Sequence, residues 1–170
     1  QKAQLNGIEL KGADLSGIIL TSADLRAADL SEANLSGAKL NSTNLTVADL
    51  SVSNLTKSDL SSSNFTNAYL EQANLNGANL RYSIFTNAHL EQANLSNVDL
   101  SSSNFTNAHL QKANLNDACL EGANLIGINL IEASLRRTNL NNAQISETDL
   151  SRADLSFVNL TNNISLVNVN

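Results

Sequence analysis

The sequence has no proline, methionine or tryptophan, and Cys119 is its only cysteine. A single cysteine excludes an internal disulfide and any zinc site built from several thiolates. Aromatic residues make up only 4% of the 170 residues, so a core must be filled mainly by Leu and Ala. Basic residues are also scarce, with 10 Lys and Arg against 16 Asp and Glu and a net charge of -6. Because nucleic acids and anionic membranes attract basic surfaces, we expect neither as a partner.

Long apolar runs are absent as well, since no stretch approaches the roughly 18 residues that a transmembrane helix needs. We therefore expect no direct membrane contact from this segment. The first residue is Gln1 rather than Met, and we expect the segment to be a domain of a larger protein. The expected compartment is the cytoplasm, either free or tethered to a membrane by a segment outside this sequence.

What the sequence does contain is a repeat of five residues. Every fifth position from Leu5 to Leu160 is a large apolar residue: 28 of the 32 are Leu, and the others are Phe65, Phe85, Phe105 and Ile145. We call this position i. Position i−2 is Ala in 19 repeats, position i−1 is Asn in 13 and Asp in 8, and all seven glycines fall at i+2. Such internal regularity determines the fold and must be interpreted before any single motif.

A period of five fits neither an α-helix nor a straight strand, because either would point many of the leucines into water. The chain must therefore turn once per repeat. Residues i−2 and i lie on the inner side of a short extended segment, and i−1 points outward. Residues i+1 and i+2 make the corner, where glycine adopts a positive φ without steric cost.

A second period of twenty residues shows how many corners complete one coil. The stretch that begins at Ser61 recurs from Arg81 and again from Ser101. Four repeats therefore form one coil, and successive coils stack as parallel strands about 4.8 Å apart. About eight coils over residues 1–160 predict a rod about 38 Å long.

The repeats resemble the motif A(D/N)LXX of the pentapeptide repeat family, as in ADLSG from Ala13, ANLSG from Ala33 and ANLNG from Ala73. The resemblance covers about 160 of the 170 residues without an insertion. It implies an all-β fold, a right-handed parallel quadrilateral β-helix over residues 1–160, with an irregular or strand-like cap or tail over 161–170. The cap is expected because Ser165 occupies the apolar position. Members of the family include inhibitors of DNA gyrase that look like DNA, and many cyanobacterial proteins without an established activity.

Two histidines are the first candidates for chemistry. His89 and His109 both occupy i−1, twenty residues apart, with Tyr69 one coil earlier. They should stack on an outer face, where nearby Glu71 and Glu91 would complete a set of ligands for a divalent metal. A surface ladder inherited from duplicated coils explains the same pattern, and we favour it. We therefore assign no metal site, cofactor or catalytic residue, and we expect no enzyme, since parallel columns of identical groups do not form a concave pocket.

The other i−1 residues predict surface ladders. Stacked Asn side chains can bond along the axis, whereas stacked carboxylates repel one another. The many Asn-X-Ser/Thr sequons follow from the repeat and not from glycosylation. Cys119 also occupies i−1 and should be an exposed thiol in a reducing compartment.

Charge gathers on one of the four faces, the one that carries Leu10, Leu30, Leu50 and the later members of that register. Its eight acids and three bases, Lys11, Lys112 and Arg152, give a net charge of -5. We call it the acidic face; its acids are Glu9, Asp29, Glu32, Asp49, Glu71, Glu91, Glu132 and Asp149. Only here do carboxylates follow one another in a column. Tolerated repulsion there is consistent with use in binding, although a run of charges more often marks a solvated face.

We predict that a protein with a basic surface docks on the acidic face, where charges and exposed rings combine. The candidate contact residues are Asp29, Asp49, Tyr69, Glu71, His89, Glu91 and His109. A competing contact would use the outward apolar residues Ile84, Ile126 and Ile131. Self-association through the ends of the solenoid is a further possibility, because uncovered terminal coils expose strand edges.

Two functions are compatible with this pattern. The favoured one is a non-catalytic structural scaffold or protein-protein interaction module. The alternative is a DNA mimic that inhibits or protects DNA gyrase. Duplex DNA of about 38 Å presents about 22 phosphates, whereas this chain carries 16 acids and a net charge of only -6. Bases such as Lys57, Arg136 and Arg137 interrupt the other faces, which favours the scaffold.

Overall fold

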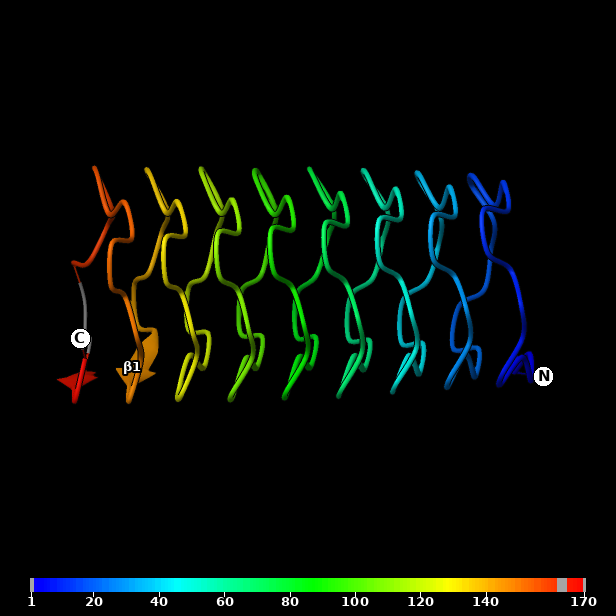
Figure 1. Ribbon diagram of the computed structural model, residues 1–170, viewed down its shortest axis with the longest axis horizontal. Helices are drawn as coiled ribbons and strands as arrows, with labels where there is room; N and C mark the ends of the chain where they lie inside the picture. Colours follow the sequence, from blue (N-terminus) through cyan, green and yellow to red (C-terminus); the bar gives the residue numbers. More distant parts are fainter. Residues whose placement is uncertain (1, 162–164, 170) are drawn as a thin grey trace.

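The chain winds into a four-sided parallel β-helix, as predicted. The computed structural model describes residues 2–161 and 165–169. Every fifth residue from Gln4 to Asn139 forms a parallel bridge with the residue twenty positions later. The two strands, β1 (Gln144–Ser146) and β2 (Ser165–Val167), also pair in parallel. Figure 1 shows the coils stacked along one axis, with the two termini at opposite ends.

The described residues contain no helix, so none of them forms a helix able to span a membrane. Backbone hydrogen bonds instead join each coil to the next, three for each repeat from Leu5 to Leu135. At Leu50, for example, the amide donates to the Tyr69 carbonyl at 2.7 Å. The amide of Val52 donates to the Glu71 carbonyl at 2.9 Å, and the Tyr69 amide returns a bond to the Ala48 carbonyl at 3.0 Å. Regular bonding of this kind fixes the register of every face.

The corners explain where glycine is found and why it is not required everywhere. In the corner after Leu50, the Ser53 amide donates to the Leu50 carbonyl at 3.1 Å, and Val52 has a φ of 59°. All i+2 residues from position 7 to position 157 share this positive φ, whether or not they are glycine. At Gly127 a steric requirement for glycine is added to the positive φ, because a Cβ atom there would collide with the Asn107 side chain. Most corners therefore hold a side chain in a left-handed conformation that usually favours glycine.

The core consists of the i and i−2 side chains, and between Ala23 and Ile145 these are almost completely buried. Phe65, Phe85 and Phe105 stack above one another as predicted. Their ring centroids lie 4.7 and 4.6 Å apart, and the planes of neighbouring rings are within 5° of parallel. The coil spacing, rather than the preference of aromatic rings for offset packing, sets this arrangement.

Buried Ser and Thr at i−2 replace Ala without leaving a hydroxyl unpaired. Ser53 donates to the Leu50 carbonyl at 2.6 Å, within its own corner. Ser83 donates across coils to the Leu60 carbonyl at 2.9 Å. Because each hydroxyl is bonded, the core accepts these residues at little cost.

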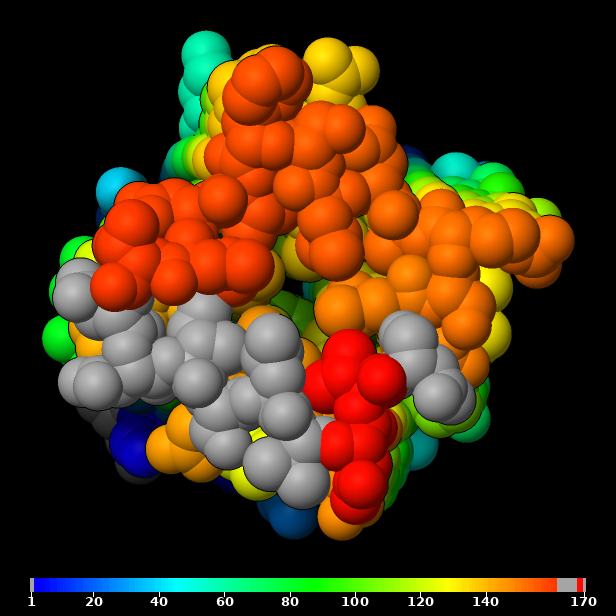
Figure 2. Space-filling model, turned by 90° about the vertical axis from the view of Figure 1, so that its left-hand side faces the viewer, coloured from blue at the N-terminus to red at the C-terminus, as the bar shows by residue number. Residues whose placement is uncertain are grey.

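The C-terminal end of the rod is less well covered than its middle. Leu155 and Leu160 occupy position i but are 41% and 48% exposed. The repeat predicts that every i side chain points into the core, but at this end the apolar position is only partly enclosed. Apolar side chains, including Leu140, Leu150 and Val169, line a cavity of about 350 Å³ there. Figure 2 views this end and shows it hollowed at its centre.

The repeat register slips by one residue near the C-terminus. Strand β2 pairs Leu166, not residue 165, with Ile145, so the step between coils is one residue longer than twenty. Asn168 then has the positive φ, 53°, that belongs to position i+2. Part of the cap expected over 161–170, namely residues 162–164 and 170, lies outside the described residues. Within residues 165–169, the backbone re-forms a strand and corner after the slip.

Candidate functional site

The acidic face forms as the register predicted. Parallel bridges connect its i−1 residues in one continuous column: Glu9, Asp29, Asp49, Tyr69, His89, His109, Asn129 and Asp149. Five of the seven predicted contact residues therefore lie in a single line. The other two, Glu71 and Glu91, lie two residues further along the chain at the adjoining corner. The structure thus brings the whole predicted set onto one side of the rod.

The carboxylates in this column are stabilised by their own corners. Asp49 Oδ1 accepts hydrogen bonds from the Ser51 amide at 2.8 Å and from the Ser51 hydroxyl at 2.6 Å. Asp29 is bonded in the same way by Ser31, whose hydroxyl is the main reason that the pKa of Asp29 lies below its ordinary value. From the sequence alone, stacked acids in this column are expected to repel one another. These local donors relieve part of that repulsion without a partner.

Three basic side chains also bind acids within the same face. Lys11 Nζ lies 3.0 Å from Glu32, and this contact raises the pKa of Lys11. Arg152 and Lys112 both approach Glu132, at 2.6 and 3.8 Å. These pairs are exposed and contribute little stability. They lie toward the two ends of the face and leave its centre, from Asp49 to His109, without a Lys or Arg partner among the described residues.

At mid-rod the column becomes a stack of rings. The Tyr69 and His89 ring centroids are 5.2 Å apart, the His89 and His109 centroids are 4.9 Å apart, and both pairs are within 13° of parallel. Tyr69 is 42% exposed, whereas both imidazoles are half-buried. His89 Nδ1 also lies 3.5 Å from Glu91 Oε1. The stack is therefore an exposed, rigid feature bordered by carboxylates.

The corner residues beside this stack carry buried oxygen atoms. Glu71 Oε2, Glu91 Oε2 and Gln111 Oε1 are shielded from solvent and accept no hydrogen bond from the described residues. They occupy one column, at i+1, because the three residues are twenty apart. Buried polar atoms in proteins are nearly always paired, so three successive exceptions mark this corner as unusual.

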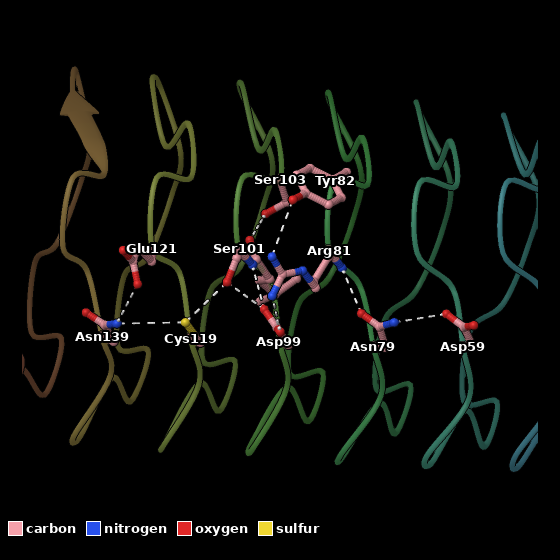
Figure 3. Close-up of polar contacts among 11 residues, drawn as sticks. Asp59, Asn79, Arg81, Tyr82, Asp99, Ser101, Ser103, Cys119, Glu121 and Asn139 are labelled. Atoms are coloured by element: carbon pink, nitrogen blue, oxygen red, sulfur yellow. Dashed lines mark hydrogen bonds and ion pairs between the residues drawn. The ribbon is translucent and has the colours of Figure 1, made fainter.

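A group on the opposite face, around Leu80 and Leu100, was not predicted from the sequence. Arg81 Nη1 binds Asp99 at 3.1 Å, and Arg81 Nη2 donates to the Tyr82 hydroxyl at 3.3 Å (Figure 3). Burial alone would raise the pKa of Asp99, but bonds from Ser101 and Arg81 bring it below its ordinary value. A signal was present in the sequence, because Arg81, Tyr82 and Ile84 replace the Ser, Ser and Asn of the two related coils. Tyr82 is 56% and Ile84 40% exposed.

Cys119 lies in the same column, one coil beyond Asp99 (Figure 3). Its thiol is half-buried rather than exposed as the sequence suggested, because Ser101 Oγ lies 3.3 Å away and Asn139 Nδ2 3.8 Å away. The other outward apolar candidates, Ile126 and Ile131, are also half-buried. Of the three apolar residues of the competing contact, only Ile84 is exposed.

The Asn ladders form as expected. Asn54 Nδ2 donates to Asn34 Oδ1 at 3.2 Å, and Asn94 Nδ2 donates to Asn74 Oδ1 at 3.1 Å. The same oxygens also accept bonds from position i+1 of their own corner, as from the amide of Ser96 to Asn94 at 3.2 Å. Where position i+1 is Ser or Thr, its hydroxyl adds a second bond to the same oxygen, as from Ser96 to Asn94 at 2.7 Å. This hydroxyl bond explains why Ser or Thr so often follows Asn at the second residue. The sequon pattern is therefore a feature of the corner.

Comparison with known proteins agrees with this geometry. The family model described as pentapeptide repeats matches in 8 copies, over residues 8–46, 43–81, 83–122 and 118–156. Among curated protein sequences, none matches the chain. No catalytic family is indicated by the family match or by the structures that resemble the chain.

Two solved structures illustrate the likeness. HetL, a pentapeptide repeat protein involved in heterocyst differentiation regulation from the cyanobacterium Nostoc sp. strain PCC 7120, is 27% identical. That alignment covers 98% of this chain and 87% of HetL, with a TM-score of 0.56. A trypsin-treated form of QnrB1, a plasmid-mediated fluoroquinolone resistance protein, is 19% identical over 98% of this chain and 87% of that one, with a TM-score of 0.66. At that identity, QnrB1 supports the fold alone.

The family model spans most of the chain, and between Ala23 and Ile145 the matched repeats have the bridges, the corners and the buried i and i−2 side chains described above. The chain belongs to the pentapeptide repeat family.

Proposed function

We propose that this chain is a non-catalytic scaffold that binds a protein with a basic surface through its acidic face. The observation that carries the proposal is the unbroken column from Asp29 through Asp49 and Tyr69 to His89 and His109. Regular hydrogen bonding between coils holds this column in a fixed geometry. A rigid surface loses little conformational entropy when it binds, which favours association.

The shape of the rod supports binding of a macromolecule rather than catalysis. The described cavity at the C-terminal end is lined by apolar side chains only, and it lies far along the chain from the central charges. The predicted contact residues instead form a line on the outer surface of successive coils. An extended charged line suits another protein surface, whereas a small substrate needs a concave site.

The pairing of charges argues against the DNA-mimic alternative. Glu32 and Glu132 on the acidic face are bound by Lys11, Lys112 and Arg152. On another face, Arg137 binds Asp117 at 2.6 Å. A surface that imitates duplex DNA needs a dense and uninterrupted series of negative charges. The described ion pairs interrupt that series on more than one side of the rod.

Affinity capture with a matched pair of variants tests the proposal. The untagged chain is immobilised, and the proteins that it retains from a lysate of the source organism are identified. They are compared with the proteins retained by one triple variant that carries Asp49→Asn, Glu71→Gln and Glu91→Gln. These changes keep the shapes of the side chains, and Gln111 already occupies the column of Glu71 and Glu91. The control is a second triple variant with Arg81→Ser, Tyr82→Ser and Ile84→Asn. At these three positions it has the residues of the two related coils that begin at Ser61 and Ser101.

We expect the acidic-face variant to lose the retained protein and the control to keep it. Binding should also weaken at about 1 M salt, where the Debye length falls to about 3 Å. Equal retention by the acidic-face variant and at high salt would refute the proposal. Loss only in the control would assign binding to the corner that carries Arg81, Tyr82 and Ile84. Inhibition of gyrase supercoiling by the pure chain would favour the DNA mimic.

A further inference from the structure

We infer, contrary to the expectation from the sequence, that His89, Glu91 and His109 form a binding site for a divalent transition metal ion such as Zn²⁺. One potential ligand atom from each residue lies within 4.8 Å of the other two. Metal binding by this cluster is a separate property from the proposed docking of a protein, because the ligand is a single ion. Two imidazoles and one carboxylate are a donor set that zinc sites in proteins use.

The state of Glu91 is a second observation that points to a ligand. Its Oε1 atom lies 3.5 Å from His89 Nδ1, and its Oε2 atom is buried without a hydrogen-bond partner among the described residues. A buried carboxylate oxygen that lacks a partner is costly. A cation held between the carboxylate and the imidazoles would compensate the charge of Glu91.

The geometry requires only side-chain adjustment. Zinc bonds of about 2.0 to 2.2 Å place ligand atoms about 3.4 Å apart in a tetrahedral site. The His89 and Glu91 atoms already approach that separation, at 3.5 Å. His109 must tilt toward them from its stacked position, in which the two ring centroids are 4.9 Å apart. Both imidazoles are half-buried and border on solvent, so their rings can tilt without displacing the core.

The donor atoms also indicate which metals bind. Imidazole nitrogen favours zinc, copper and nickel, whereas Mg²⁺ and Ca²⁺ prefer sites made of oxygen alone. A bound ion would connect the coil that begins at Arg81 with the coil that begins at Ser101. Because these ligands are brought together only by folding, binding should stabilise the folded chain.

Calorimetric titration of the metal-free chain with ZnCl₂ tests the inference. The protein is prepared without a histidine tag, so that His89 and His109 are its only histidines. The test variants are His89→Asn, His109→Asn and Glu91→Gln. Asn129 continues the histidine column, and Gln111 continues the column of Glu91, so these replacements suit the repeat. Glu121→Gln and Cys119→Ser are controls on the opposite face of the rod.

We expect one saturable zinc ion per chain, no comparable binding of Mg²⁺, and a zinc-dependent rise in melting temperature. Each test variant should lower the zinc affinity by at least about tenfold. Loss of a residue that only hydrogen-bonds to a metal ligand already lowers affinity by that much, and here the ligand itself is removed. The controls should bind like the unmodified chain. Absence of saturable binding, full affinity in His109→Asn, or equal loss in the controls would overturn the site.

The assignment can be separated from the docking proposal. His109→Asn leaves every carboxylate of the acidic face in place and removes one metal ligand. If zinc binding is lost while the protein partner is retained, the two functions are independent. Circular dichroism of each metal-free variant establishes that it is folded before its affinity is compared.

Discussion

The Phe85 ring lies parallel to the Phe105 ring, with centroids 4.6 Å apart and planes 5° from parallel. Phe65 stacks on the other side of Phe85 at 4.7 Å. Phe85 is thus enclosed by aromatic rings above and below and has no exposed surface. If the Phe85 side chain were shortened, the neighbouring rings could not easily move to fill the volume that it occupies.

Replacing Phe85 with Ala should therefore lower the free energy of unfolding by about 3 to 5 kcal/mol, because a cavity remains between two rigid coils. Phe85→Leu is the matched control, since Leu occupies this position in most repeats, and it should cost about 1 kcal/mol. Urea unfolding followed by circular dichroism measures both. Similar losses in the two variants would mean that the rings do not fill the core as described.

A charge in the core should be far more harmful than the same charge on a corner. Leu75 is fully buried, and Leu75→Asp should reduce stability by more than about 4 kcal/mol. The control is Asn67→Asp, because exposed Asn67 accepts a hydrogen bond from Asn87 that Asp can also accept. The melting temperature should fall only in the first variant, and equal melting temperatures would contradict the inward orientation of position i.

Asn76 is not a suitable control for that experiment, although its corner position suggests an inert site. Its amide donates to the Ser96 carbonyl at 3.0 Å and to the Ser96 hydroxyl at 2.8 Å. Asn76→Asp would place a carboxylate against a carbonyl oxygen. We therefore expect a measurable loss of stability where the sequence alone suggests none.

Val52 offers a test of strain at the corners. Its φ of 59° is unfavourable for a β-branched residue. Val52→Gly should raise the free energy of unfolding by about 1 kcal/mol, since the left-handed conformation costs other residues about that much. The same change at Val98, which is buried and not at an i+2 corner, should instead lower it by about 2 kcal/mol. Urea unfolding measures both changes. If Val52→Gly lost as much stability as Val98→Gly, strain at the corner would be excluded.

Acid should destabilise the rod through its hydrogen-bonded carboxylates. The hydroxyls of Ser31, Ser151 and Ser156 lower the pKa values of Asp29, Asp149 and Asp154 in the folded chain. A lowered folded pKa contributes stability above the ordinary value of about 3.9. That contribution is lost as the pH falls through the folded pKa. The urea midpoint should therefore decrease below about pH 4.

Changing all three serines to Ala should flatten this acid-dependent decrease, because the carboxyl pKa values return toward the unfolded ones. Ser96→Ala is the control, since the Ser96 hydroxyl donates to the uncharged Asn94 at 2.7 Å. It should leave the pH dependence unchanged. Urea midpoints at pH 7 and pH 3 provide the comparison, and an unchanged slope in the triple variant would count against the role of these hydroxyls.

The sequence determined the coil, the four faces and the order of residues in each column, because both periods are visible in the leucines and in the three related coils. It could not locate the slip before Leu166, since a shift of one residue leaves no mark once the motif has ended. It also missed the bonds of Ser31 to Asp29 and the buried oxygen of Glu91. Those depend on the rotamers of side chains at the corners, and the repeat fixes only their backbone.

The twenty-residue step between Asp29 and Asp49 has a consequence for how such a chain can grow. Insertion of a whole coil leaves every downstream face aligned with the one upstream, so a binding surface is simply lengthened. Insertion of a single repeat keeps the leucines inward but rotates all later residues by a quarter of a revolution. A gene of this kind can therefore change its length in small steps without harm to folding, whereas its surface columns survive only when the added length is a multiple of four repeats.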